Sequence, residues 1–343
     1  MNQDWQNFLA TQGAQIQDGV VNNFGDVAAE QLATRDNTVL CDLSQFGTLR
    51  VSGEEAEAFL QSMLSNDISE ASKTRAQLSS LNTAKGRMLT TLLIWREEND
   101  YLMQLPRELC IAISKKLSMY VLRAKVKITD VSEEIISLGL SGEHAQGILH
   151  TQLGELPQLP LDVSHADFGS VIKINGLRWQ INTTLRQAPA LWMKLSEKAW
   201  PVSSGCWDWL NIRSGIPFIL PNTQEQFVAQ MVNFDLIKGV NFKKGCYPGQ
   251  EIVARTQYLG KLKRRMYLAH IAADEKPRAG DELFSADMEG QATGMLVNVA
   301  NAPTGGYDVL AVVQITSHAT HSVHLGKLQG TQLAFDILPY PLT

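Results

Sequence analysis

The 343-residue chain lacks several features that would place it in a specialised class. It contains no CxxC pair, which argues against a zinc ribbon or a dithiol redox centre and favours reduced thiols in the cytoplasm. It contains no run of about 18 apolar residues, so no membrane-spanning helix and no membrane partner are expected. No basic residue and no apolar h-region precede Arg35, so no secretory signal is visible. We therefore expect a cytoplasmic protein with four scattered thiols, Cys41, Cys110, Cys206 and Cys246.

The chain also lacks an excess of basic residues. It contains 30 Lys and Arg and 35 Asp and Glu, which gives a net charge of -5. An acidic chain is not typical of a dedicated nucleic-acid-binding protein. The sequence also lacks GxGxxG, P-loop, HExxH and GxSxG motifs, so nucleotide binding through the usual loops is not supported. A hydrophobic content of 44% is ordinary for a globular chain, and the length allows two or three domains.

The first half of the chain predicts alternating strands and helices after a polar, aperiodic segment over residues 1–36 that has one weak helical stripe. Ser52 and Glu55 form the pattern of a capping box, which predicts that a helix begins at Ser52. A second helix is expected after Pro106, as far as about Leu122. The resulting β-α-β-β-α-β order predicts a ferredoxin-like unit. The expected strands cover 38–43, 47–51, 77–81, 88–95, 101–105, 126–130 and 135–140.

The second half predicts a hairpin and a separate all-β region. Asn175-Gly176 between two apolar runs is a strong hairpin signal. A helix is expected over 207–212, and from Arg265 onward only strands and turns are expected, which favours a C-terminal β-barrel. We therefore expect a region over 1–264 of two interleaved subdomains, with an internal boundary near 150–165, and a barrel domain over 265–343.

The segment Lys243–Glu251 concentrates reactive groups on special backbone. Tyr247-Pro248-Gly249-Gln250 predicts a type II turn, since proline presets φ at the second position and glycine accepts positive φ at the third. Cys246 would lie at this bend, beside two lysines that favour its thiolate. The alternative is a loop with a buried cysteine and solvated lysines.

The same segment lies within a basic stretch. Between Lys238 and Tyr267 the only acid is Glu251, which suggests an anionic partner such as a polyglutamylated cofactor, a phosphate or RNA. A solvated basic face is the alternative. The stretch contains eight cations: Lys238, Lys243, Lys244, Arg255, Lys261, Lys263, Arg264 and Arg265.

Other candidate sites are weaker. His318, His321 and His324 resemble a metal cluster, but in a strand His321 would point away from the other two, so no metal site is expected. Trp207 and Trp209 could stack on a planar ligand or fill a core.

The motif Lys244–Glu251 resembles the signature of the YgfZ family of folate-binding proteins, relatives of the glycine-cleavage T-protein, an aminomethyltransferase. Further matches extend the resemblance over about residues 38 to 341. They are the Ala84-Lys85-Gly86-Arg87 turn, Leu210-Asn211-Ile212 with Gly215 and Pro217, and the closing Leu338-Pro339-Tyr340.

The resemblance implies an α+β, T-protein-like multidomain ring and tetrahydrofolate as the ligand. It also implies a role in maintaining iron–sulfur enzymes, including the one that thiomethylates adenosines in tRNA. Lys244 and Cys246 would be the catalytic pair, and Trp207 would stack on the folate. A second family tryptophan falls at Phe46, which keeps an aromatic face without an indole N–H. Further folate contacts are expected from Lys243, Tyr247, Gly249, Gln250, Glu251 and Arg255.

The chain departs from the T-protein where that enzyme has its catalytic Asp. Leu89-Thr90-Thr91 occupies this stretch and supplies no general acid or base. The glutamate that reads the pterin in the T-protein has no counterpart around Thr183-Thr184-Leu185. Plain aminomethyl transfer is therefore not expected. Three functions stay open: a folate-dependent accessory protein for iron–sulfur clusters, a one-carbon transferase or demethylating enzyme, and a tRNA-binding module.

Overall fold

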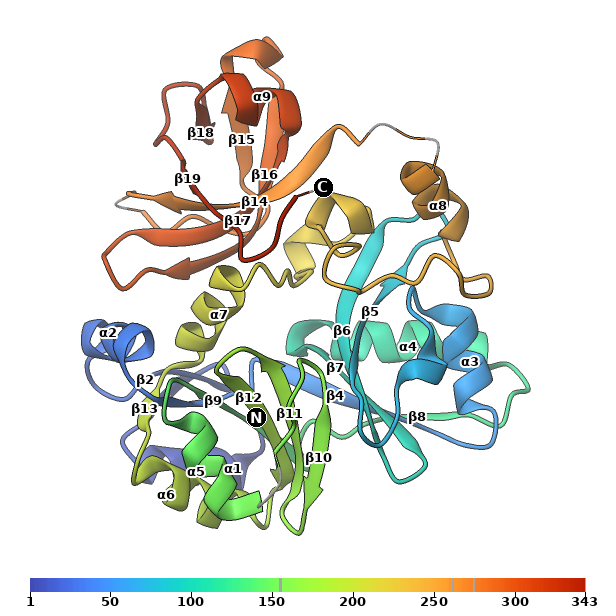
Figure 1. Ribbon diagram of the computed structural model, residues 1–343, viewed down its shortest axis with the longest axis vertical. Coiled ribbons are helices and arrows are strands. Elements are labelled where there is room, and N and C mark those ends of the chain that lie inside the picture. Colours follow the sequence, from blue (N-terminus) through green and yellow to red (C-terminus); the bar gives the residue numbers. More distant parts are fainter. Residues whose placement is uncertain (154–155, 259, 261, 274, 343) are drawn as a thin grey trace. The chain divides into compact units, whose positions relative to one another are not determined.

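The computed structural model describes residues 1–342 except 154–155, 259, 261 and 274 (Figure 1). The chain forms two compact units and passes between them several times. Unit 1 comprises residues 1–59, 69–77 and 93–207, and unit 2 comprises residues 60–68, 78–92 and 208–343. The expected domain boundaries at 264/265 and near 150–165 stay predictions. Among the described helices, none is long and apolar enough to cross a membrane.

Unit 1 contains a six-stranded sheet in the order β10-β11-β12-β9-β3-β13. Its pairs are antiparallel except β3 with β13. The predicted hairpin over Asn175-Gly176 is confirmed as β11–β12. Helices α1, α5 and α6 contribute Leu9, Leu149 and Trp192 to one core cluster with strand residues of this sheet (Figure 1). The elements are α1 (Gln3–Thr11), β3 (Val39–Asp42), β9 (Ile135–Ser141), α5 (Ala145–Leu153), β10 (Val163–Ala166), β11 (Gly169–Asn175), β12 (Arg178–Thr184), α6 (Ala188–Ser196) and β13 (Trp200–Val202).

The N-terminal segment is more ordered than its polar sequence suggests. Residues 1–36 form α1, the hairpin of β1 (Gln15–Gln17) and β2 (Val20–Asn23), and α2 (Val27–Asp36). Asn2 and Asp26 accept hydrogen bonds from the first backbone N–H groups of α1 and α2, as N-caps do. Trp5 is fully buried, and its indole N–H donates to Asp42 over 2.7 Å. The expectation of a largely aperiodic segment was therefore wrong, although a weak helical stripe was expected and two helices are present.

A second sheet has the order β5-β6-β7-β4-β8. The part β8-β4-β7-β6 has the strand order of a ferredoxin-like unit, and this prediction is confirmed. The predicted start of its first helix is wrong, because α3 begins at Ala56 and the Glu55 carboxylate accepts the Lys125 backbone N–H at 2.6 Å. Strand β5 and the first half of β6 belong mostly to unit 2. The elements are β4 (Phe46–Ser52), α3 (Ala56–Met63), β5 (Gln77–Asn82), β6 (Met88–Glu97), β7 (Asp100–Pro106), α4 (Cys110–Val121) and β8 (Lys127–Asp130).

Unit 2 contains a curled six-stranded sheet in the order β18-β15-β16-β17-β14-β19 (Figure 1). Successive side chains point to opposite faces, so Leu268 and Leu310 join one core cluster, and Ala269 and Val309 join another. The elements are α7 (Ser204–Arg213), whose residues 204–207 belong to unit 1, α8 (Gln250–Tyr258), β14 (Arg264–Ile271), β15 (Glu282–Ser285), β16 (Ala292–Asn301), β17 (Tyr307–Gln314), α9 (Ile315–Thr320), β18 (Val323–Leu325) and β19 (Ala334–Asp336).

Helix α9 corrects the expectation of strands and turns only after Arg265. Tertiary contacts stabilise this short helix, because the buried Ser317 hydroxyl accepts from Thr293 and donates to Asp287. His318 lies in α9 with its ring stacked on Tyr267, at 3.7 Å between centroids. The assumption that the three histidines share one strand was therefore wrong.

Candidate functional site

The predicted type II turn is present in unit 2. The Gln250 backbone N–H donates to the Tyr247 carbonyl over 3.1 Å, and Gly249 has a φ of +82°. Helix α8 begins directly at Gln250. The turn thus brings the chain from the Cys246 loop into a helix without an intervening connection.

The four thiols differ sharply in exposure. Cys246 is exposed, whereas Cys41, Cys110 and Cys206 are buried. Burial raises the pKa of the Cys110 thiol to about 12. Cys246 is therefore the one of the four thiols that lies open to solvent.

Lys244, two residues before Cys246, is buried with 7% of its surface exposed. Its ammonium group donates to the carbonyl oxygens of Gln61 and Leu64 at 2.6 Å each, and of Asn66 at 3.1 Å. These oxygens lie at and just beyond the C-terminal end of α3, where a cation is favourable. Burial lowers the pKa of Lys244 to about 8. The ammonium therefore fastens the Cys246 loop to the end of α3.

Tyr247 stands on the other side of Cys246 and is also buried. The Lys244 ammonium lies 5.2 Å from the centre of its ring, within the range of a cation–π contact. Burial raises the pKa of the Tyr247 hydroxyl to about 12. The exposed cysteine is thus flanked by two buried, fixed side chains.

Two motifs that are far apart in the sequence meet at Gly249. A Cβ atom added to Gly249 would lie 2.5 Å from the Gly86 Cα and 2.5 Å from the Thr83 carbonyl oxygen. The turn over residues 83–87 is closed by a hydrogen bond from Gly86 N–H to Thr83 O at 2.9 Å. The two glycines therefore allow the backbones of the two turns to touch. This places the Lys85-Gly86-Arg87 tip directly beside the turn that follows Cys246.

Two further residues of the family resemblance, Gly215 and Tyr340, contact each other in unit 2. The Tyr340 hydroxyl donates to the Gly215 carbonyl over 2.7 Å. Gly215 has a φ of +65°, and an added Cβ would lie 2.6 Å from the Tyr340 ring. These residues fasten the end of the chain to the segment after α7, which is a structural role.

A buried polar cluster next to Lys244 was not identified from the sequence. The Ser80 hydroxyl contacts the Ser65 hydroxyl and the Asn82 side-chain oxygen at 3.0 Å each. Ser65 donates to the Gly239 carbonyl over 2.8 Å, and the neighbouring Asn66 carbonyl is one of the acceptors of Lys244. The available signal was the pair of serines between two leucines in strand β5.

The basic stretch divides into internal and exposed cations. The Arg265 guanidinium is buried and pairs with Asp235 at 2.7 and 3.0 Å. Together with Lys244 it is committed to internal partners. Lys261 lies outside the described residues. Four cations are exposed, and no ion pair joins them to a carboxylate in the part of the chain that the structure describes: Lys238, Lys243, Arg255 and Lys263.

The two aromatic candidates belong to unit 1. Trp207 is 2% exposed and Phe46 is 8% exposed. The Arg178 guanidinium lies 4.1 Å from the centre of a Trp207 ring, and Gly139 lies so close to this ring that an added Cβ would fall within 2.6 Å of two of its carbon atoms. The indole thus packs on the sheet of unit 1, and its contact with folate stays a prediction.

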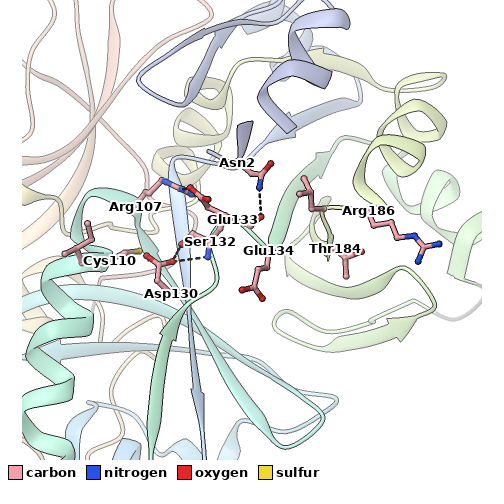
Figure 2. Close-up of a pocket in the computed structure, with 11 residues that line it drawn as sticks. Asn2, Arg107, Cys110, Asp130, Ser132, Glu133, Glu134, Thr184 and Arg186 are labelled. Atoms are coloured by element: carbon pink, nitrogen blue, oxygen red, sulfur yellow. Dashed lines mark hydrogen bonds and ion pairs between the residues drawn. The ribbon is translucent and has the colours of Figure 1, made fainter. Parts of the chain in front are cut away.

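Unit 1 also contains a pocket of about 860 Å³ at the N-terminal end of α4 (Figure 2). Arg107 and Glu133 form an ion pair of 3.7 Å at its wall, and the Asn2 amide donates to the Glu133 carbonyl. None of the predicted site residues lines this pocket. The lining residues are Asn2, Arg107, Cys110, Ile111, Asp130, Ser132, Glu133, Glu134, Thr184, Leu185 and Arg186.

Comparisons with known proteins agree with this geometry. The family model described as the GCVT N-terminal domain matches residues 8–198. Two curated relatives are each named tRNA-modifying protein YgfZ. The one from Colwellia psychrerythraea is 29% identical over 259 residues, which cover 75% of this chain and 79% of the relative. The one from Hamiltonella defensa is 28% identical over 275 residues, which cover 79% and 82%. The resemblance to YgfZ proteins is therefore confirmed.

The fold has a counterpart among solved structures. The glycine cleavage system aminomethyltransferase T from Bartonella henselae superposes with a TM-score of 0.80 at 18% identity. The superposition covers 99% of this chain and 98% of that enzyme. The predicted α+β, T-protein-like fold is confirmed.

Proposed function

We propose that this chain, which belongs to the family of the GCVT N-terminal domain, is a folate-binding protein that supports tRNA modification, with Cys246 as its functional thiol. The observation that carries the proposal is the placement of Cys246. It is exposed, while Lys244 before it and Tyr247 after it are buried and fixed. A thiol that only filled a core would be buried.

The role in tRNA modification is supported by the relatives. Both are named for it, and the similarity spans 79–82% of their length. The finer proposal, that the chain maintains the iron–sulfur enzymes that thiomethylate tRNA adenosines, follows from the resemblance of the Lys244–Glu251 motif. We propose these enzymes or their assembly factors as its partners.

Tetrahydrofolate as the ligand also follows from that resemblance, and unit 2 offers a fit for one end of it. Folates end in glutamate carboxylates, and exposed ammonium and guanidinium groups pair with carboxylates. Lys243 and Arg255 flank the Cys246 loop in sequence and are exposed. When bound, the folate would supply one-carbon chemistry. Gln250 and Glu251, the first two residues of α8, are further proposed folate contacts.

In this proposal Lys244 positions the loop and Cys246 carries the chemistry. Three carbonyl acceptors around the Lys244 ammonium leave its donors occupied. Plain aminomethyl transfer is disfavoured, because Leu89, Thr90 and Thr91 are buried in β6 and supply no carboxylate. The chain is thus better described as an accessory folate protein than as a transferase.

The test is a titration of the full chain with tetrahydrofolate, its methylene and formyl forms, and tRNA. We expect saturable binding of reduced folates, with a change in tryptophan emission that is lost or reduced in Trp207→Phe. Stacking on an aromatic ring is worth about 1 kcal/mol beyond area burial. An equal response in wild type and Trp207→Phe would remove Trp207 from the site. Salt-dependent tRNA binding without folate binding would favour the tRNA-binding alternative and refute the proposal.

A further inference from the structure

Helix α4 in unit 1 carries large apolar side chains on its solvent side as well as on its buried side. Cys110, Ile113 and Leu117 are buried, as expected for a helix that packs on a sheet. The solvent side also carries large apolar side chains, since Ile111 is 67% exposed and Met119 is 72% exposed. A surface helix normally presents polar residues there, and clustered exposed apolar residues indicate an interaction surface.

Leu122, the residue that follows the helix, is also a large apolar residue exposed to solvent. Leu122 has a φ of +49°, a backbone conformation that glycine adopts easily and bulky residues avoid. Its side chain is 87% exposed, so it adds nothing to the core. A leucine that is both strained and exposed is not explained by stability of the folded chain. Such strain is typical of functional positions.

The segment from α4 to β8 is strongly basic. Residues 111–129 contain no acid and five cations: Lys115, Lys116, Arg123, Lys125 and Lys127. Lys125 pairs with Glu54 at 2.6 Å. Within the described residues, no ion pair joins the other four to a carboxylate. These cations are interleaved with the apolar residues, in a chain whose net charge is -5.

We propose that this surface, the α4 outer face, docks an acidic segment of a partner protein that also carries apolar side chains. We define the face by Ile111, Lys115, Met119, Tyr120, Leu122 and Arg123. Apolar anchors supply affinity in protein interfaces, and complementary charge supplies specificity and rate. The face is about 18 Å long, from the rise of a 12-residue helix. Ile111 at its N-terminal end also lines the pocket, which gives a partner side chain a concave place to insert.

A protein partner fits this surface better than RNA or a membrane. Ile111, Met119 and Leu122 have neither a planar surface for a base nor a donor for a phosphate, and only Tyr120 could stack. A membrane-binding helix separates its apolar face from its cations, whereas here they alternate.

The test is site-specific photo-cross-linking of the full chain in cells of its source. A photoreactive residue replaces Met119. The matched control carries the same residue at Ile337, an exposed apolar position in unit 2. We expect a cross-link to one protein from position 119 and none from position 337. The cross-linked peptide should carry a net negative charge and apolar residues. Cross-linking to RNA, to lipid or to a second copy, or equal yields at both positions, would overturn the proposal.

Two variants of the face sharpen the test. Lys115→Glu with Arg123→Glu should lower the yield of the cross-link about tenfold and leave folate binding unchanged. Leu122→Gly should relieve the positive φ, raise the melting temperature and also lower the yield. An undiminished yield in the charge-reversed variant would refute the acidic partner. A lower melting temperature of Leu122→Gly would refute the claim that Leu122 is strained.

Discussion

Lys244 and Cys246 are separated by one residue, yet they have opposite surroundings. The lysine is buried against carbonyl oxygens of residues 61, 64 and 66, and the cysteine is exposed. A charged side chain that is normally solvated has thus been taken into the protein, while a side chain that is normally buried has been left outside. This inversion supports the proposal that Lys244 positions the loop and that Cys246 carries the chemistry.

The exposure of Cys246 predicts its reactivity. Iodoacetamide at neutral pH should label Cys246 before Cys41, Cys110 or Cys206, as mass spectrometry of brief reactions would show. Cys246→Ala should keep the wild-type melting temperature because the side chain fills no core. The matched control, Cys206→Ala, removes a buried side chain and should lower stability by about 1 kcal/mol. If Cys246 is labelled no faster than the buried thiols, its role is structural and the prediction fails.

Replacing Lys244 should weaken the fold. Lys244→Met leaves three carbonyl oxygens without their donor, and an unsatisfied buried polar group costs about 1–3 kcal/mol. Urea unfolding should therefore show a lower midpoint than wild type. Lys243→Met is the control, since Lys243 is exposed and its loss should change little. Equal stability of both variants would show that the carbonyl contacts do not fasten the loop.

The same lysine predicts a pH dependence of stability. Burial lowers the pKa of Lys244 from 10.5 to about 8. Between pH 8 and 10.5 the unfolded chain therefore binds more protons at this site than the folded chain, so the free energy of unfolding rises with pH in this window. Lys244→Met should lack this contribution. If the free energy of unfolding changes with pH in the same way in wild type and Lys244→Met, the lowered pKa of Lys244 is contradicted.

At the level of elements, the Cys246 loop depends on two turns that touch. Gly249 needs a positive φ, and its missing Cβ makes room for the turn over 83–87. Gly245, on the other side of Cys246, has no atom within 4 Å of an added Cβ. The fold therefore requires glycine at position 249, whereas it leaves room for a side chain at position 245.

This contrast gives a matched pair of variants. Gly249→Ala should destabilise the protein by about 1–3 kcal/mol, from the strained backbone and the clash with Gly86 and Thr83. Gly245→Ala should be close to neutral. Thermal unfolding of both variants checks the expectation. A neutral Gly249→Ala would mean that the two turns separate without cost.

Elements with local sequence signals were predicted from sequence. The Asn175-Gly176 hairpin, the Tyr247–Gln250 turn and the ferredoxin-like order each follow from turn residues or hydrophobic period. Helix α9 was missed because its support comes from Thr293 and Asp287, which lie outside it in sequence. Helices α1 and α2 were missed although their capping residues, Asn2 and Asp26, were visible.

At the level of the whole molecule, candidate site residues could be named from the motif, but their surroundings could not. The carbonyl partners of Lys244 lie 178 to 183 residues away in sequence, so only the fold reveals them. The basic stretch suggested an anionic partner near the Cys246 loop, whereas Arg265 and Lys244 are used internally. Long-range contacts, not local patterns, decide which charges stay available.

The remaining exposed cations predict how the ligand is held. If they bind the glutamate tail of a folate, tetrahydrofolate with five glutamates should bind more tightly than the monoglutamate, and added salt should reduce the gain. Lys243→Ala with Arg255→Ala should remove most of the gain, while Lys327→Ala, an exposed lysine elsewhere in unit 2, should not. Isothermal titration measures each affinity. Equal affinities for both folates in the wild type would rule out this use of the stretch.

The central claim, that Cys246 is the functional thiol of a protein that supports tRNA modification, is tested most directly in cells that lack the chain. The measurement is the amount of thiomethylated adenosine in their tRNA, by mass spectrometry, after return of wild type, Cys246→Ala or Cys206→Ala at equal protein levels. We predict that wild type and Cys206→Ala restore the modification and that Cys246→Ala leaves it at the level of the deletion. Full restoration by Cys246→Ala would contradict the account.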